Sequence, residues 1–242
     1  WQAICSALHN CSIETLKISD IGMGPKGAVT LGEMLRSAGE GGGKLIGAMS
    51  SVTLSSTGYP TEPKTYTIEK GVNELNLSNV NLGPGDMMVI SALIQTGLIA
   101  AMSFLDVSKS NLGNDGAEAI GQAVVSSQIQ TIVIGPKSTK VDLSGVEKWE
   151  LSGQELGPSE MVLLGSMLRS ACEVRPELIA AMSFFDVSGN FVFGSKRDSY
   201  GRLVHDVDAD LSGWHALCIA LGSCSIQTLN ISDIGMGPKG VA

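Results

Sequence analysis

The sequence predicts an α/β solenoid, in which short strands and helices alternate along the chain and stack unit upon unit. Three observations lead to this prediction. One long segment is duplicated, a shorter apolar frame recurs along the chain, and most copies of that frame lead into a glycine and a helical apolar pattern. Self-similarity of this kind is typical of stacked architectures, because each unit buries its apolar face against the next one.

The duplicated segment spans residues 1–29 and returns as residues 214–242. Twenty of the 29 aligned positions are identical. The second copy stops partway through a unit. We therefore expect residues 1–242 to form a single repeat domain that is a window of a longer tandem array.

The shorter frame places apolar residues at positions 1, 4, 6, 9 and 11 and a glycine at position 12. It is clearest from Val72 to Gly83 and returns from Met102 to Gly113, with further copies near 13–24, 146–157 and 226–237. Apolar residues two apart, such as Leu75 and Leu77, are typical of a short strand with one buried face. Each frame therefore predicts one short strand.

A helix is predicted after each strand. Proline follows the frame glycine at Pro25, Pro84, Pro158 and Pro238. Proline is favoured at the first helical position, where its missing N–H costs nothing. Apolar residues then recur at helical spacing, as in Met87, Ile90, Leu93 and Ile94 and again in Met161, Leu164, Met167 and Leu168.

Two segments, VNELNLSNVNLGPGDMMVISALI and MSFLDVSKSNLGNDGAEAIGQAV, resemble leucine-rich repeats of the ribonuclease-inhibitor type. The resemblance extends over most of the chain. It implies a right-handed horseshoe with parallel strands on the concave face and helices on the convex face. The chain departs from the family at position 9, where the family places Asn or Cys. Asn190 is the one regular occupant, and the other units have Ile21, Val80, Ser110, Gln154 and Ile234.

Three inserts interrupt the pattern, near residues 57–71, 129–144 and 191–210. The first carries prolines and a TYTI run, the second is again extended around Gly135-Pro136, and the third is the longest and most charged. Such stretches are typical of loops or hairpins. Inserts on one rim of a repeat array are common partner sites, so we expect the inserted loops near Tyr59 to Tyr66 and Phe193 to Asp210 to take part in binding.

Composition excludes several classes of protein. The formal charge of −8 is opposite in sign to that of a typical nucleic-acid binder, and no apolar run reaches the length of a membrane span. Five cysteines form an odd set without a CxxC pair, which argues against a zinc site and a complete disulfide framework. Unpaired cysteines favour a reducing intracellular compartment.

No cofactor, metal or catalytic site is predicted. Residues 22–27 match GxGxxG, but equivalent turns along the chain share its glycine, so the motif is interpreted as structural. Residues 205–210 place three carboxylates at alternate positions like the start of a calcium loop, yet Leu211 and Leu217 stand where that loop has Gly and Glu. We interpret this stretch as a solvated loop, and calcium binding stays an open alternative. His9, His205 and His215 do not form a repeated site, so we do not expect an enzyme.

The residues expected to face outward from the strands suit a protein ligand. They form a mixed, mildly acidic row with two aromatic side chains beside it, and aromatic anchors ringed by polar groups are typical of protein interfaces. The candidate partner-binding residues are Lys17, Asn76, Phe104, Asp106, Glu150, Phe184, Asp186 and Asn230.

We therefore expect a non-enzymatic protein-interaction or assembly scaffold that binds an unidentified protein partner. Two alternatives remain. The resemblance implies relatives that regulate another enzyme, either as inhibitors or as activators of a GTPase. A permanent structural subunit of a large complex would also suit the low fraction of charged residues.

Overall fold

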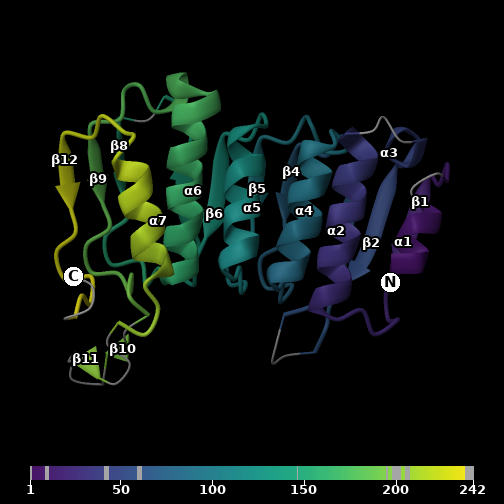
Figure 1. The fold of residues 1–242 in the computed structure, drawn as a ribbon, viewed down its shortest axis with the longest axis horizontal. Helices are drawn as coiled ribbons and strands as arrows, with labels where there is room; N and C mark the ends of the chain where they lie inside the picture. The colour runs from purple at the N-terminus through teal and green to yellow at the C-terminus, as the bar shows by residue number, and fades with distance from the viewer. Residues whose placement is uncertain are drawn as a thin grey trace.

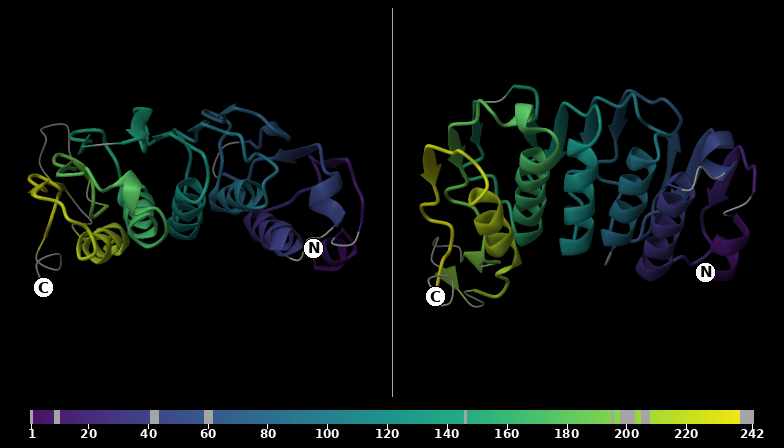
Figure 2. Two further views of the ribbon diagram at one scale, coloured as in Figure 1. Left: turned by 90° about the horizontal axis from the view of Figure 1, so that it is seen from above. Right: turned by 45° about the horizontal axis from the view of Figure 1, so that its top comes forward.

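The computed structural model describes residues 2–8, 11–40, 44–58, 62–145, 147–194, 196–197, 203–204 and 208–237. Helices form one layer and strands lie in a second layer on one side of it (Figure 1 and Figure 2). The helices are α1 (Gln2–Leu8), α2 (Pro25–Glu40), α3 (Lys44–Ala48), α4 (Pro84–Gln95), α5 (Asn114–Val125), α6 (Pro158–Val174), the 3₁₀ turn η1 (Pro176–Leu178) and α7 (Ser212–Leu221).

The long helices lie side by side in chain order, so α2 packs on α4, α4 on α5, α5 on α6 and α6 on α7 (Figure 1). Glycines allow this close approach. A Cβ atom added at Gly32 would lie 2.8 Å from the backbone of Met88, and one added at Gly165 would lie 2.8 Å from the backbone of Ala216. Any larger side chain at these two positions would push the neighbouring helices apart.

Helices α4 and α6 begin at Pro84 and Pro158, as the Gly-Pro pairs predict. Both also have an acidic residue in the first turn. Asp86 accepts a hydrogen bond from the Gly83 N–H at 2.7 Å, and Glu160 accepts one from the Gly157 N–H at 3.0 Å. These bonds satisfy a backbone donor that the helix itself leaves unpaired.

Asp86 also joins α4 to the strand layer. Its buried carboxylate accepts hydrogen bonds from the N–H and hydroxyl of Thr57, at 2.7 and 2.8 Å, and from the Tyr66 hydroxyl at 2.9 Å. Burial, together with the charge of Asp86 and its hydrogen bond, raises the pKa of Tyr66 well above its usual value. The Tyr66 hydroxyl therefore stays protonated and donates.

The strands fall into separate small sheets. The first has the order β1-β2-β3, with β1 (Thr15–Ile18), β2 (Ser51–Ser55) and β3 (Thr65–Glu69). The second has the order β4-β5-β6-β7, with β4 (Glu74–Asn76), β5 (Phe104–Asp106), β6 (Thr131–Ile134) and β7 (Thr139–Asp142). The third has the order β12-β9-β8, with β8 (Lys148–Glu150), β9 (Phe184–Asp186) and β12 (Thr228–Asn230). A two-stranded hairpin joins β10 (Lys196–Arg197) and β11 (Leu203–Val204).

The prediction of a leucine-rich repeat solenoid is therefore wrong. That fold needs one parallel sheet along a concave face, whereas the described strands form three separate sheets and a hairpin. Parallel pairs such as β4–β5 stand beside antiparallel pairs such as β2–β3 and β6–β7. The structure is a mixed α/β arrangement of small sheets against a row of helices.

The inserts explain why the parallel pairing stops. The insert at 57–71 contributes β3, which pairs antiparallel with β2. The insert at 129–144 contributes β6, which pairs parallel with β5, and then β7, which turns back and pairs antiparallel with β6. β3 and β7 thus occupy the edges that a following parallel strand would have used. As a result β4 and β8 each begin a new sheet.

Apolar side chains from both layers form a single core, which includes Leu31, Leu54, Ile90, Leu105 and Phe185. Some of the segments for which the sequence makes predictions are only partly described by the structure. The description leaves out residues 1, 9–10 and 238–242 of the duplicated segment, residues 59–61 of the first insert, and residues 195, 198–202 and 205–207 of the third. In the part of the chain that is described, no helix is both long and apolar enough to cross a membrane.

Candidate functional site

The candidate residues lie at the ends of short strands, where the chain turns toward a helix. Asn76 and Asp106 each accept a hydrogen bond from the N–H of the serine two residues on, at 3.0 and 2.9 Å. Asp186 and Asn230 do the same, at 2.8 and 3.2 Å. Side-chain bonds of this kind close a turn. Four of the eight candidates therefore have a structural role, whatever else they bind.

The residues that follow these four serines, and those that follow Ser19 and Ser152 in the related turns after β1 and β8, adopt a left-handed backbone. These residues are Asp20, Asn79, Lys109, Gly153, Gly189 and Asp233, with φ between 55° and 67°. Apart from Lys109, they are the residue types that tolerate this conformation. These turns have a sequence signal that apolar periodicity does not contain. It consists of an outward residue, an apolar residue, Ser and then Asn, Asp or Gly.

Asn190, the one regular occupant of position 9, bonds the backbone of its turn. It is buried, its Nδ2 donates to the carbonyls of Leu151 and Val187 at 2.7 and 2.9 Å, and its Oδ1 accepts from the Leu156 N–H at 3.0 Å. The side chain thus links the turn after β9 to the turn after β8.

The first group of candidates lies in the sheet β4-β5-β6-β7. Asn76 on β4 pairs in register with Asp106 on β5, and Val133 on β6 lies on the other side of Asp106. Val133 is buried and only 8% of Asp106 is exposed. Asp106 is therefore far less accessible than its place in the outward row predicts.

The second group lies in the sheet β12-β9-β8. Glu150, Asp186 and Asn230 form one register row across the three strands. The Asn230 Nδ2 donates to Asp186 Oδ2 at 3.0 Å, and Glu150 forms an ion pair of 2.9 Å with Lys148. Partial burial opposes ionisation of Asp186, but hydrogen bonds from Ser188 and Asn230 outweigh it and lower the pKa of this carboxyl. Asp186 is thus held as a partly exposed anion.

The two candidate aromatic side chains occupy the same place in their sheets. Phe104 lies between Glu74 on β4 and Thr131 on β6, and Phe184 lies between Lys148 on β8 and Thr228 on β12. Both phenylalanines are half-buried. Each therefore presents part of an apolar ring among polar neighbours.

Lys17 lies apart from both groups. It is exposed on β1, in the sheet β1-β2-β3, where its register partner on β2 is Thr53 and the partner of Thr53 on β3 is Thr67. The structure thus brings Asn76, Phe104 and Asp106 together in one sheet and Glu150, Phe184, Asp186 and Asn230 together in another. We call the outward side of the second sheet the β9 face, defined by Lys148, Glu150, Phe184, Asp186, Thr228 and Asn230.

A second duplication underlies the likeness of these two groups. Residues 98–108 read LIAAMSFLDVS, and residues 178–188 read LIAAMSFFDVS. The single difference places Leu105 or Phe185 on the buried side, where Phe185 packs edge-on against Trp149 with ring centroids 6.0 Å apart. This repeat at an offset of 80 residues could have identified β5 and β9 as equivalent strands from the sequence alone.

The possible calcium-binding segment at 205–210 has local hydrogen-bond partners at the residues that the structure describes. Residues 205–207 of the possible calcium segment lie outside the described residues. Asp208 accepts from the Gly237 N–H at 2.8 Å, and Asp210 accepts from the N–H of Ser212 at the start of α7 at 2.9 Å. Across the described ranges, no three His, Cys, Asp or Glu side chains are grouped so that they could hold a metal ion.

The helix layer has its own groove, of about 260 Å³, between α5, α6 and α7. It contains His215 and is crossed by the ion pair of Arg169 with Glu118, at 2.6 Å. Both side chains of that pair are partly exposed, and such pairs contribute little to stability. The groove lies on the helices and shares no residue with the β9 face.

Comparison with protein-family models and with curated proteins finds no match for this chain. The resemblance to leucine-rich repeat proteins therefore stays a prediction, and the sheet topology contradicts the fold that it implies. Arguments about function rest on the geometry above.

Proposed function

We propose that this chain is a non-enzymatic protein-binding module and that the β9 face is its principal contact surface. The observation that carries the proposal is Phe184, a half-buried aromatic ring held on a rigid strand between Lys148 and Thr228. Beside it runs the polar row Glu150, Asp186 and Asn230. An aromatic anchor within a polar surround is the arrangement that protein interfaces favour.

The hydrogen bonds on the β9 face support a preorganised surface. Asp186 accepts bonds from Ser188 and Asn230, and Lys148 holds Glu150. The bonds to Asp186 therefore order this side chain before a partner arrives, which lowers the entropy lost on binding, whereas the exposed pair of Lys148 and Glu150 adds little. The inward residue Phe185 is fully buried against the core and fixes the position of the strand.

The charge of the face indicates the chemistry of the partner. Asp186 is a partly exposed anion, Lys148 neutralises Glu150, and the whole chain carries a formal charge of −8. A polypeptide segment that places an apolar side chain on Phe184 and an Arg or Lys near Asp186 would complement this surface. Arginine suits the site best, because its planar fork bonds carboxylates in two places.

Phe104 supports a second contact point for the same partner. It repeats the sequence context of Phe184 and is also half-buried. Its neighbouring carboxylate, Asp106, is covered, so the contribution at this point is mainly apolar. Binding by the inserts, including the hairpin β10–β11, stays a prediction.

The test is site-specific photo-crosslinking in extracts of the source organism. A benzophenone amino acid replaces Phe184 in one variant and Ile219, which is 59% exposed on α7, in the control. We expect one protein to be crosslinked from position 184 and not from position 219. Phe184→Ala should then weaken the affinity for that protein by about 30-fold. Equal crosslinking from both positions, or unchanged affinity of a folded Phe184→Ala variant, would refute the proposal.

A further inference from the structure

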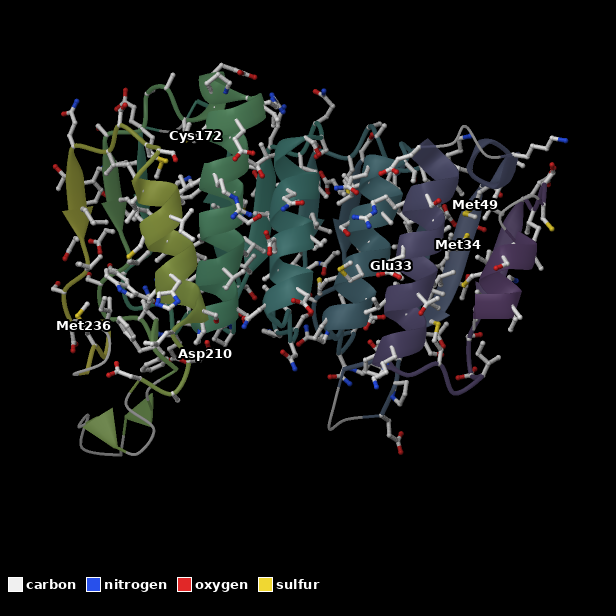
Figure 3. All side chains as sticks on the ribbon, viewed as in Figure 1. Glu33, Met34, Met49, Cys172, Asp210 and Met236 are labelled. Carbon is white, nitrogen blue, oxygen red and sulfur yellow. The ribbon has the colours of Figure 1, made fainter. Side chains whose placement is uncertain are left out.

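Two cysteines from distant parts of the chain meet at the end of the helix layer. Cys172 lies in the last turn of α6, and Cys224 lies three residues after the end of α7. Their sulfur atoms are 3.3 Å apart, and the Cys172 Sγ is also 3.2 Å from the carbonyl of Ser223. Figure 3 labels Cys172 at the upper end of α6, beside α7. Both are free thiols.

Close packing of α6 and α7 and a closed turn after α7 bring the two sulfur atoms together. Helices α6 and α7 approach closely at Gly165, and again at Gly213, where an added Cβ atom would lie 2.7 Å from the carbonyl of Pro158. The turn that carries Cys224 is closed by backbone bonds from Ser223 to Ala220 and from Cys224 to Leu221, at 3.0 and 3.3 Å. The meeting of the thiols therefore follows from the packing of α7 on α6.

The positions of Cys172 and Cys224 each have a counterpart in a repeated segment of the sequence, and these counterparts do not form a thiol pair. The sequence MLRSA occurs at 34–38 in α2 and at 167–171 in α6, and it is followed by Gly39 in α2 and by Cys172 in α6. An added Cβ at Gly39 would overlap the side chain of Thr96, just after the end of α4. Cys11 aligns with Cys224, and its sulfur donates to the Ala7 carbonyl at 3.1 Å. Among these related places, only α6 and α7 bring two sulfur atoms together.

We propose that Cys172 and Cys224 are a redox-modification site and form a reversible disulfide that ties the end of α6 to the turn between α7 and β12. A disulfide bond is about 2.05 Å long, so the sulfur atoms need to close by little more than 1 Å. The oxidant is a low-molecular-weight disulfide such as oxidised glutathione. The site does not depend on the proposed partner-binding function.

The reaction is two thiol–disulfide exchanges. In the first, the thiolate of Cys172 attacks one sulfur of oxidised glutathione, a Cys172–glutathione bond forms, and the first glutathione leaves and takes up the proton that Cys172 lost. In the second, the sulfur of Cys224 attacks the sulfur of Cys172, the mixed disulfide breaks, and the second glutathione leaves with the proton of Cys224. Two protein thiols are oxidised and one glutathione disulfide is reduced to two thiols.

The order of attack follows from the surroundings of Cys224. Burial, together with the hydrogen bond and charge of Cys172, raises the pKa of the Cys224 thiol to about 12. A raised pKa leaves little of the reactive thiolate at Cys224, so Cys172 is taken as the first nucleophile, and the same bridge results whichever sulfur attacks first. Cys172 is also partly exposed at the surface, where a small disulfide can reach it.

The disulfide would close a loop between residues 52 apart, which contains β9, the hairpin β10–β11 and α7. A crosslink of this span restricts the unfolded chain, so the oxidised protein should unfold about 10 °C above the reduced protein. Oxidation would thereby stiffen the C-terminal part of the chain around the β9 face.

The test is incubation of the full chain in glutathione buffers of increasing oxidised fraction, followed by thiol counting and peptide mapping. We expect the thiol count to fall from five to three, a crosslinked peptide pair that contains residues 172 and 224, and a higher Tm that dithiothreitol reverses. Peptide mapping uses the unaltered chain, so it does not depend on the folding of a variant.

Matched variants separate this pair from general cysteine reactivity. Cys224→Ser should abolish the bridge and the rise in Tm, whereas Cys11→Ser, at the aligned position, should leave both unchanged. Five unreacted thiols, a lasting glutathione adduct on Cys172 without a bridge, or a disulfide that includes Cys5 or Cys218 would each overturn the proposal. None of these results would bear on partner binding.

Discussion

Two copies of one sequence segment have different surroundings in this molecule. The first copy supplies α1 and β1, and the second supplies α7 and β12. Ile21 in the first copy is 55% exposed, but the aligned Ile234 is 2% exposed. Leu16 is 7% exposed, but the aligned Leu229 is 41% exposed. Identical or similar residues thus belong to the core in one copy and to the surface in the other.

The difference comes from which neighbours the chain provides. The first copy packs against elements that follow it, because α1 contacts α2 and β1 pairs with β2. The second copy packs against elements that precede it, because α7 contacts α6 and β12 pairs with β9. Burial, and with it each residue's contribution to stability, is therefore set by tertiary neighbours more than by local sequence.

The largest contrast should come from the isoleucine pair. Ile234→Ala removes a fully buried side chain and should lower the free energy of unfolding by about 3 kcal/mol, whereas Ile21→Ala should change it by less than about 0.5 kcal/mol. Urea denaturation of the two variants measures both values. Equal losses for the two variants would mean that their surroundings are the same.

The leucine pair should give the opposite order with a smaller difference. Leu16→Ala should lower the free energy of unfolding by about 2 kcal/mol, because Leu16 packs in the core, and Leu229→Ala should lower it by about 1 kcal/mol or less. The same denaturation experiment applies. If Leu229→Ala proved the more harmful change, Leu229 would have to pack as a core residue, against its 41% exposure.

Alkaline pH should lower the stability of the sheet β1-β2-β3, which contains the strand of the first copy. The pKa of Tyr66 is raised in the folded state, so its contribution to stability is complete below about pH 10, the usual value. It is lost as the pH rises from there through the folded-state pKa, which would free β3 from Asp86 and loosen β2. Thermal unfolding between pH 8 and 11 should show this loss. In Tyr66→Phe the loss should be smaller, and an identical profile would argue against the contribution of Tyr66.

The aligned cysteines should differ in a smaller, kinetic way. Removing Cys172 takes away the hydrogen bond and charge that help to raise the pKa of Cys224. Cys172→Ala should therefore lower that pKa and speed alkylation of Cys224 by iodoacetamide at pH 9, about tenfold for each unit of pKa. Mass spectrometry follows Cys224 and Cys11 in one sample. An equal acceleration at Cys11 would indicate general loosening instead.

Much of the local structure could be predicted from the sequence. The alternation of Leu75 with Leu77 places β4, and Gly83-Pro84 places the start of α4, because both signals depend on residues close in the chain. The division of the strands into separate sheets could not be predicted in this way. Alternating apolar residues look the same in parallel and antiparallel strands, so the run at 65–69 did not reveal that β3 would close the edge of β2.

The candidate surface was predictable only in outline. The outward row of residues was found from strand periodicity, but periodicity carries no information about what covers a residue. Asp106 and Asp186 share their sequence context, and each lies between two parallel strands, yet Asp106 is buried whereas Asp186 is partly exposed. The thiol pair lacked any local signal, because Cys172 and Cys224 lie 52 residues apart and meet only when α7 packs on α6.

The measurement that tests the central claim most directly is hydrogen–deuterium exchange of the chain alone and in complex with the protein crosslinked from position 184. If the β9 face binds that protein, backbone amides at 183–188 and 228–230 should exchange more slowly in the complex, and those of α5 and α6 should not change. Protection confined to the helix layer, around Glu118, Arg169 and His215, would contradict the account and place the partner on the opposite side of the molecule.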